Sequence, residues 1–393
     1  MEWFEPEVRA TIERLFGCPA EAARIELLAA HASSRTYWRL HLRPQDAPRT
    51  LTLMMLNRED RGIKSDEIVE IESTLEEIPF VNVHRFLSAF TDAAPEIYFH
   101  DEAKGLLYLE DLGDTLFETV VADASDEVRR TWYGRAIDLL VALQTEGTRR
   151  LDDACVASRA AFTETLFLWE FEHFIEYGLG TKLGRDVPAR DLASLREAFA
   201  PIARALAAEP RVFTHRDFQS KNLLVQPEVP PEVLPEILSE ARADSGKAAR
   251  ADSKRETRAD ITQGARLRLI DFQDALRGPR TYDLVALLRD SYVELSPALL
   301  ERLIDDYLAR SKAAGFDPGR EAFRAAFARM TLQRKLKDYG RFVYIDRVKG
   351  NPDYLRYNPA NARYVLEAAS RLPELGAARE ILARALGADA GRA

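Results

Sequence analysis

The sequence predicts an α+β fold of two lobes, a small β-rich lobe followed by a larger, mostly helical one. Three observations point to this organisation. Runs of β-forming residues characterise the first part of the chain, helical periodicity takes over from Thr115, and 393 residues exceed the usual size of one compact domain. We place the join near residues 109–113, which gives a first domain over residues 1–110 and a second over residues 111–393.

The first lobe is predicted to contain helices and two pairs of strands. Apolar residues recur at helical spacing over residues 5–16, with Pro6 near the start and Gly17 just after the end, as in a capped amphipathic helix. Two β-forming runs joined by a polar turn predict an antiparallel hairpin. The hairpin strands are expected at residues 36–42 and 50–56, two further strands at residues 97–99 and 106–109, and a second helix at residues 68–75.

The second lobe is predicted to hold long helices around one short hairpin. The helices are expected at residues 128–144, 162–177 and 192–206, with another beginning at Ser296-Pro297, where serine suits the N-cap and proline the first helical position. The hairpin strands are expected at residues 222–225 and 267–270.

Residues 227–264, between these two strands, differ in composition from the rest of the lobe. They contain four prolines, fourteen charged residues and no aromatic residue. Such a segment offers little apolar surface to offset the entropy of ordering. We therefore predict an insertion of low order, either partly disordered or forming one solvated helix.

Composition and charge exclude several classes of protein. The net charge is −9, with 55 basic residues spread along the chain, so binding to nucleic acid without sequence preference is not expected. The two cysteines, Cys18 and Cys155, have no neighbours at metal-ligand spacing, which argues against a zinc site or a disulfide framework. The N-terminal residues do not have the pattern of a signal peptide, and no apolar run approaches the length of a membrane span. A cytoplasmic protein is the expectation.

Three oxygen-bearing side chains lie next to the predicted strands of the hairpin in the second lobe. Asp217 and Asn222 are separated by four residues in a loop that leads into one strand, and Asp271 directly follows the other. Adjacent strand ends can direct these side chains to one place. Magnesium prefers such oxygen ligands together with phosphate oxygens and water. Phosphoryl transfer also needs one carboxylate near the attacking hydroxyl, so the pattern favours a kinase.

The same residues carry a resemblance to a known family. His215-x-Asp217-x4-Asn222, followed by Ile270-Asp271-Phe272, resembles the catalytic and metal-binding loops of the aminoglycoside phosphotransferase family, relatives of protein and choline kinases. Residues 106–117 and 166–180 are similar to its interlobe hinge and to the first helix of its substrate subdomain. Residues 278–295 and 332–342 resemble the branch that phosphorylates the anomeric hydroxyl of N-acetylmuramate and N-acetylglucosamine during cell-wall recycling.

The resemblance implies a protein-kinase-like bilobal fold, with ATP and Mg²⁺ as cofactors, and assigns roles to individual residues. Asp217 would be the catalytic base, and Asn222 and Asp271 would hold magnesium on the nucleotide phosphates. Asp283 would brace the catalytic loop, while His215 is expected to hold the loop through backbone hydrogen bonds. The backbone of Glu110, Asp111 and Leu112 would bind the adenine.

The first lobe departs from the family pattern at the nucleotide phosphates. The strand that carries a lysine in many members has Met54 and Met55 here, and the residues before the hairpin lack the glycines of a phosphate loop. Ser33, Ser34 and Arg35 are the expected substitutes, because hydroxyl, amide and guanidinium groups donate to phosphate oxygens.

The acceptor side is predicted from charge. Arg289 and Asp290 follow a helix start that looks buried, and Gln333, Arg334 and Lys337 share one helical face. An antibiotic polyamine needs a strongly acidic pocket, so this mixed and basic group favours a neutral or anionic sugar.

The best functional hypothesis is therefore a small-molecule kinase whose partner is an amino sugar, phosphorylated at its anomeric hydroxyl. An aminoglycoside, choline or another amino alcohol as acceptor would require the same catalytic residues. A catalytically silent nucleotide-binding regulator is a further alternative, suggested by the absent strand lysine.

Overall fold

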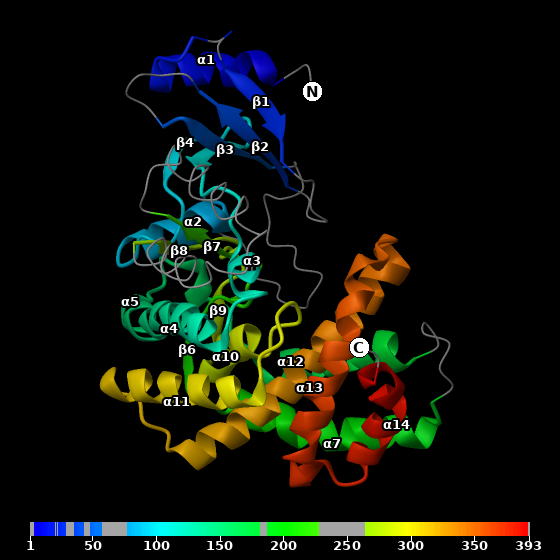
Figure 1. Ribbon diagram of the computed structural model, residues 1–393. Helices are drawn as coiled ribbons and strands as arrows, with labels where there is room; N and C mark the ends of the chain where they lie inside the picture. Colours follow the sequence, from blue (N-terminus) through cyan, green and yellow to red (C-terminus); the bar gives the residue numbers. More distant parts are fainter. Residues whose placement is uncertain are drawn as a thin grey trace, which may run out of the picture.

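The computed structural model describes residues 4–19, 21, 23–28, 35–42, 48–56, 77–180, 187–227 and 264–391. These residues form a small lobe built on one sheet and a larger helical lobe, which lie at opposite ends of the view in Figure 1. The expected helix at residues 68–75, Ser33 and Ser34, and residues 228–263 of the expected insertion lie outside the described residues.

A five-stranded antiparallel sheet forms the small lobe, in the order β1-β2-β3-β5-β4. Alternation of buried and partly exposed residues along β2 and β3 gives the sheet two different faces. The strands are β1 (Arg24–Leu27), β2 (Thr36–His41), β3 (Thr50–Met55), β4 (Ile97–Asp101) and β5 (Leu106–Glu110).

Each face of the sheet is covered by a different helix. α1 (Glu5–Phe16) places Val8 and Ile12 against Trp38 and Leu53 on one face. Gly17 ends this helix in the left-handed conformation, with φ of 65°, as a C-terminal glycine does. The opposite face includes Met54, which belongs to the core of the larger lobe together with residues of α2 (Pro79–Ser88). α2 therefore packs between the sheet and the larger lobe, as Figure 1 also shows.

Helices make up most of the larger lobe. The long α11 (Pro297–Ala313) lies near the bottom of the view in Figure 1, and α12 (Arg320–Lys349) rises from there to the right-hand side of the lobe. The others are α3 (Phe117–Val121), α4 (Asp126–Ala142), α5 (Thr148–Arg150), α6 (Glu164–His173), α7 (Ala189–Ala207), α10 (Arg280–Leu288), α13 (Asn358–Ser370) and α14 (Ala378–Ala390). Two π-helical segments, η3 (Leu143–Gly147) and η5 (Phe174–Leu179), extend α4 and α6, and the short 3-10 helices are η4 (Val156–Ser158), η7 (Pro352–Tyr357) and η8 (Pro373–Leu375).

Four short strands between α7 and α10 form two separate two-stranded sheets. β6 (Arg211–Thr214) pairs with β9 (Leu276–Pro279), and β7 (Leu223–Gln226) pairs with β8 (Arg266–Leu269), both antiparallel. The chain runs through the strands in the order β6, β7, β8, β9. One short loop joins β6 to β7, and another joins β8 to β9. These two loops carry the predicted catalytic residues.

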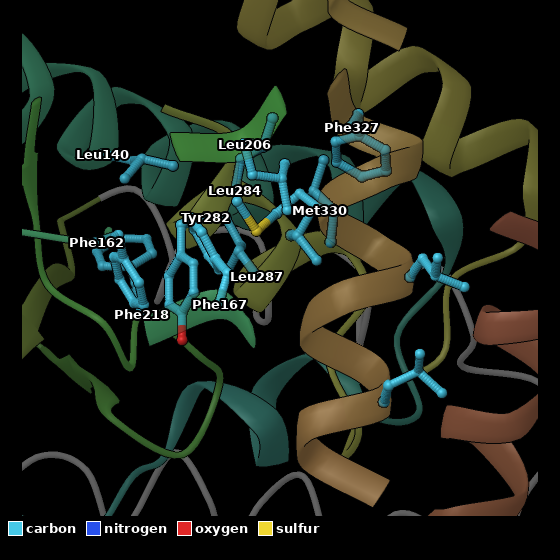
Figure 2. Close-up of a cluster of buried hydrophobic side chains, with 14 of the residues drawn as sticks. Leu140, Phe162, Phe167, Leu206, Phe218, Tyr282, Leu284, Leu287, Phe327 and Met330 are labelled. Atoms are coloured by element: carbon cyan, nitrogen blue, oxygen red, sulfur yellow. The ribbon is translucent and has the colours of Figure 1, made fainter. Parts of the chain in front are cut away.

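Aromatic and aliphatic side chains support the loops from below. Figure 2 shows Phe162, Phe218 and Tyr282 close together, with Leu284, Leu287 and Met330 continuing the core toward α12. The rings of Phe162 and Tyr282 lie 4.2 Å apart, and all of these side chains are buried. Close packing of this kind holds the backbone above it in one position.

The elements predicted within the described residues are confirmed, with small shifts at their ends, whereas the helix expected at residues 68–75 lies outside them. The helix predicted at residues 5–16 is α1, both predicted hairpins are present, and Ser296 caps α11 by accepting a hydrogen bond from Leu299 N–H at 3.2 Å. β1, β6, β9, α2, α3, α13 and α14 were not predicted. None of the helices among the described residues is long and apolar enough to cross a membrane.

Candidate active site

The first catalytic loop joins β6 to β7 and is held by its own side chains. Asn222 Nδ2 donates to the backbone oxygen of Asp217 at 2.9 Å, and Asp217 N–H donates to Nδ1 of His215 at 3.2 Å. Arg216 has φ of 77°, a conformation that non-glycine residues adopt at a cost. These bonds maintain that turn and fix Asp217 at its tip.

The second loop joins β8 to β9 and lies directly beside the first. Leu223 pairs with Leu269. The next residue, Ile270, donates its N–H to the backbone oxygen of Asn222 at 3.1 Å. His215 Nε2 donates to Ile270 O at 3.1 Å, which ties the two loops together. Asp271 also has a positive φ, of 64°. The structure therefore brings Asp217, Asn222 and Asp271 to adjacent loop positions.

His215 is a buried link between the loops. Its Nδ1 accepts a hydrogen bond and its Nε2 donates one, so the ring is the neutral tautomer protonated at Nε2. Burial lowers the pKa of this imidazole to about 4. A ring that stays neutral at physiological pH holds the loop without exchanging protons.

Two buried carboxylates anchor the first loop at both ends. Asp283 in α10 accepts from the backbone N–H of His215 at 2.7 Å and of Arg216 at 3.0 Å. Asp290, just after α10, accepts from Ser220 N–H at 2.9 Å. Burial raises the pKa of Asp283 to about 7, and it outweighs the backbone hydrogen bonds from His215 and Arg216 and the charge of Arg334, which act in the opposite direction. The loop is thus fixed to one helix before and after Asp217.

Cations surround the Asp217 carboxylate. Arg334 on α12, itself buried, donates from Nη2 to Asp217 Oδ1 at 3.2 Å and from Nη1 to Arg216 O at 2.8 Å. Burial alone would raise the pKa of Asp217, but the charges of Lys337, Arg334 and Arg216 outweigh it and hold the pKa well below its usual range. Asp217 is ionised at neutral pH, and 38% of its side chain remains exposed to a reactant.

Asp271 has the surroundings expected of a metal ligand. Desolvation by the surrounding protein raises the pKa of its carboxyl, and the negative charge of Asp217 raises it further. The hydrogen bond from Gln273 and the charge of Arg35 act in the opposite direction. Its side chain is nevertheless exposed. A divalent cation would relieve the repulsion between the two carboxylates. In Asn222 the hydrogen bond to Asp217 uses Nδ2, so Oδ1 is the atom that could bind the ion.

Arg35 is the described member of the predicted phosphate-binding group. It stands immediately before β2, and its charge acts on the Asp271 carboxyl. A guanidinium in this place lies on the side of the small lobe where nucleotide phosphates would meet the metal ligands. The phosphate role expected of Arg35 stays a prediction.

The predicted hinge is held by arginines from both sides. Arg268 on β8 binds Glu110 through Nη1 at 2.8 Å and Nη2 at 2.5 Å. Arg39 on β2 binds Asp111 through Nε at 2.7 Å and Asp114 through Nη1 at 2.7 Å. The side chains of Glu110 and Asp111 are thus occupied by ion pairs, and the adenine-binding role expected of the backbone here stays a prediction.

The expected acceptor residues fall into two groups. Arg334 and Lys337 lie near Asp217, and Gln333 donates to the buried Glu170 of α6. Arg289 instead binds Glu367 of α13 at 2.6 Å, and Asp290 holds the catalytic loop. The contacts of Arg289 and Asp290 are therefore structural and give no support to acceptor binding.

Comparison with known proteins identifies the family. The model of the phosphotransferase enzyme family, APH, matches residues 24–233 and 262–325, which include both catalytic loops. The chain belongs to this family. The family predicted from the loop motifs is thereby confirmed.

Curated relatives of this APH-family phosphotransferase carry one name. The N-acetylmuramate/N-acetylglucosamine kinase of Pseudomonas aeruginosa is 30% identical over 308 residues, which cover 78% of this chain and 77% of that protein. The N-acetylmuramate/N-acetylglucosamine kinase of Neisseria meningitidis is 27% identical over 317 residues, covering 79% and 80%.

Solved structures confirm the protein-kinase-like fold of this phosphotransferase. A choline kinase from Cryptosporidium parvum matches with a TM-score of 0.58 at 11% identity, covering 96% of this chain and 99% of that one. An ethanolamine kinase from Plasmodium vivax matches with a TM-score of 0.53 at 12% identity, covering 91% and 85%. At these identities the likeness extends to the fold and no further.

Sequence reasoning missed two features of the site in this phosphotransferase. Asp290 was expected at the acceptor, yet it anchors the loop from a position just after α10. Arg39 was not singled out. Arg39 lies between the buried Trp38 and Leu40 in the strand. Because successive side chains of a strand point to opposite faces, the sequence already placed this charge on the sheet face opposite α1.

Proposed function

We propose that this chain is an ATP-dependent kinase that transfers the γ-phosphate to the anomeric hydroxyl of an N-acetylated amino sugar. The observation that carries the proposal is the convergence of Asp217, Asn222 and Asp271 on two neighbouring loops. The family membership and the name shared by the curated relatives support the sugar as acceptor.

The geometry suits phosphoryl transfer by positioning. The ionised Asp217 would accept a hydrogen bond from the acceptor hydroxyl, orient it toward the phosphorus and take its proton as the new bond forms. Arg334 keeps that carboxylate charged and in place. Because the covalent work is small, correct placement supplies most of the rate acceleration.

Asn222 and Asp271 would hold magnesium on the nucleotide phosphates, and Arg35 would contribute a further positive charge. Magnesium would neutralise charge on the transferred group. No group of three His, Cys, Asp or Glu side chains able to hold a metal by itself occurs in the part of the chain that the structure describes. This fits a site completed by phosphate oxygens.

The backbone of residues 110–112 would bind the adenine, and the two domains would meet at this point. Arg334 and Lys337 would contact the acceptor side of Asp217, where a neutral or anionic sugar is favoured by the surrounding cations. The protein would act in the cytoplasm, where ATP is available.

The test is an assay with magnesium-ATP and a panel of acceptors. N-acetylmuramate, N-acetylglucosamine, glucosamine, choline and kanamycin are incubated separately with the full chain, and mass spectrometry locates the added phosphate. We expect phosphate on the anomeric oxygen of the N-acetylated sugars. Transfer to choline or kanamycin in preference to both sugars would contradict the proposal, as would an absence of transfer to any acceptor.

A further inference from the structure

The side chain of Lys221 ends among three aromatic rings. Its Nζ lies 3.9 Å from the ring centroid of Tyr292, 5.0 Å from that of Tyr357 and 5.9 Å from that of Tyr354. Nζ also donates to the Tyr357 hydroxyl at 3.3 Å. We refer to the rings of Tyr292, Tyr354 and Tyr357 as the aromatic box.

The aromatic box is built from separate parts of the chain that support one another. Tyr292 follows α10, whereas Tyr354 and Tyr357 belong to η7. The Tyr292 and Tyr357 rings meet edge to face at 4.8 Å, and the buried Phe342 of α12 packs 5.4 Å from Tyr354. Edge contacts of this kind fix ring orientation, so the box does not depend on Lys221 for its shape.

The box borders the candidate active site. Lys221 precedes the proposed metal ligand Asn222, and Tyr292 follows Asp290 by two residues, its own N–H bonded to that carboxylate at 3.1 Å. Burial raises the pKa of the Tyr292 hydroxyl well above its usual value. The negative charge of Asp290 raises it further, and that of Asp217 acts in the same direction. The Tyr292 hydroxyl is thus within electrostatic reach of the proposed catalytic base.

Aromatic faces attract cations, and an ammonium surrounded by rings is the usual form of quaternary-ammonium recognition. In this chain the position is filled by the protein's own ammonium. An acceptor with an ammonium group would have to displace Lys221 or remain beside it, and like charges at short distance disfavour the second arrangement. Charged groups of both signs lie near the box, among them Glu118 in α3, Asp338 in α12 and Arg356 in η7.

We propose that Lys221 is the internal occupant of a cation-binding box and acts as a specificity determinant, excluding acceptors that carry an ammonium group and leaving neutral or anionic ones favoured. The part that concerns acceptors rests on the proposed kinase function. The part that concerns the box does not.

Binding of tetramethylammonium chloride to the full-length protein tests the box without turnover. In Lys221→Ala the rings are left open, and we expect the cation to bind at least about ten-fold more tightly than to the wild type, by calorimetry or by chemical shift titration. Lys221→Met is the matched control, because it fills the box without charge and should not gain binding. Adding Tyr292→Leu to Lys221→Ala should abolish the gain.

Two results would overturn the proposal. One is that folded Lys221→Ala binds tetramethylammonium no better than Lys221→Met. The other is that the wild type already binds it as tightly as Lys221→Ala, which would mean that Lys221 does not occupy the box.

The wild-type protein offers a second measurement if Lys221→Ala fails to fold. Ring currents should shift the Lys221 ε-methylene protons upfield, and Tyr292→Leu should reduce that shift. Unshifted ε-methylene protons in the wild type would contradict the proposal.

An acceptor assay separates this proposal from the kinase function. We expect the ratio of choline to N-acetylglucosamine phosphorylation to rise in Lys221→Ala relative to Lys221→Met. If tetramethylammonium binds as expected but no acceptor is phosphorylated by the wild type, the proposed function fails and the box stands. If the wild type phosphorylates the sugar but Lys221→Ala gains no cation binding, the box fails and the function stands.

Discussion

The two sides of the candidate site are held by different kinds of interaction. On the catalytic side, buried carboxylates of Asp283 and Asp290 accept backbone hydrogen bonds from the loop. On the nucleotide side, Arg39 joins β2 to hinge carboxylates, of which Asp114 is 76% exposed. Buried hydrogen bonds are costly to break, whereas exposed ion pairs contribute little. We therefore expect the loop around Asp217 to be held more firmly than the Asp114 end of the hinge, whereas the pair of Arg39 with Asp111 is itself largely buried.

The largest effect should come from the base itself. We expect Asp217→Asn to lower kcat about 1000-fold, because the amide cannot take the hydroxyl proton. Nucleotide affinity should change little, since the substitution keeps the size of the side chain. Thermal stability should fall, because the buried Arg334 loses its charged partner. A steady-state assay and calorimetric ATP titration give the two readouts. Turnover within a factor of ten of the wild type would contradict the role of Asp217.

Removing an anchor of the catalytic loop should cost more stability than removing the exposed hinge carboxylate of Asp114. Asp283→Ala leaves the N–H groups of His215 and Arg216 buried without their acceptor, and we expect a loss of about 2–4 kcal/mol in the free energy of unfolding. Asp283→Asn retains one acceptor oxygen and should lose less. Urea denaturation followed by circular dichroism measures both. Equal stability of Asp283→Ala and the wild type would show that the anchor is unimportant.

The buried imidazole should make the stability of the catalytic side depend on pH. The pKa of His215 is about 4 in the folded protein and near 6.5 in the unfolded chain, so below pH 6.5 the unfolded state binds more protons. The stability advantage of the wild type over His215→Gln should therefore shrink by up to about 3 kcal/mol as the pH falls from 6.5 to 4.

Asp283 has the opposite effect on stability, because its folded pKa of about 7 lies above the unfolded value. Its contribution to the free energy of unfolding therefore rises as the pH falls below 7. It is present in both proteins and largely cancels from their difference. Urea denaturation at several pH values provides the comparison. An advantage that stays constant from pH 7.5 to 4.5 would show that His215 is not buried in the neutral form.

The metal ligand should affect nucleotide binding more than stability. We expect Asp271→Ala to weaken magnesium-ATP binding about ten-fold, as measured by calorimetry, because one oxygen ligand is lost. Asp274→Ala is the matched control, since Asp274 is a carboxylate in the same loop that also accepts from Gln273. Similar losses in both variants would indicate a general effect of charge instead of metal binding.

The smallest effect is expected at the hinge. Asp114→Ala removes an exposed partner of Arg39, and we expect a stability change of no more than about 0.5 kcal/mol, reduced further by salt. Arg39 keeps its more buried pair with Asp111. A loss as large as that of Asp283→Ala would mean that the hinge is as firmly held as the catalytic loop, which would remove the contrast between the two sides.

The sequence was most informative where function depends on local spacing. Asp217, Asn222 and Asp271 could be placed together because each adjoins a short β-forming run, and two such runs imply adjacent strand ends. Amphipathic periodicity likewise placed α1 and α11. These patterns arise from contacts between residues close in the chain or from a simple division into buried and exposed faces.

Long-range polar contacts could not be predicted in the same way. Arg334 meets Asp217 from more than a hundred positions away, and α12 buries Gln333, Arg334 and Lys335 together, so it shows no simple apolar stripe. Periodicity classifies such residues as surface. Their partners become visible only when helices far apart in the chain are packed against one another.

The pairing of Gln226 with Arg266 at the open end of the β7–β8 hairpin has a practical consequence for engineering. These two residues are held one strand spacing apart, roughly 5 Å, whatever length of chain connects them. A tight turn such as Asn-Gly would span that separation. Shortened versions of the enzyme could thus be made by joining the two strands directly, a useful route to crystals with nucleotide and sugar bound.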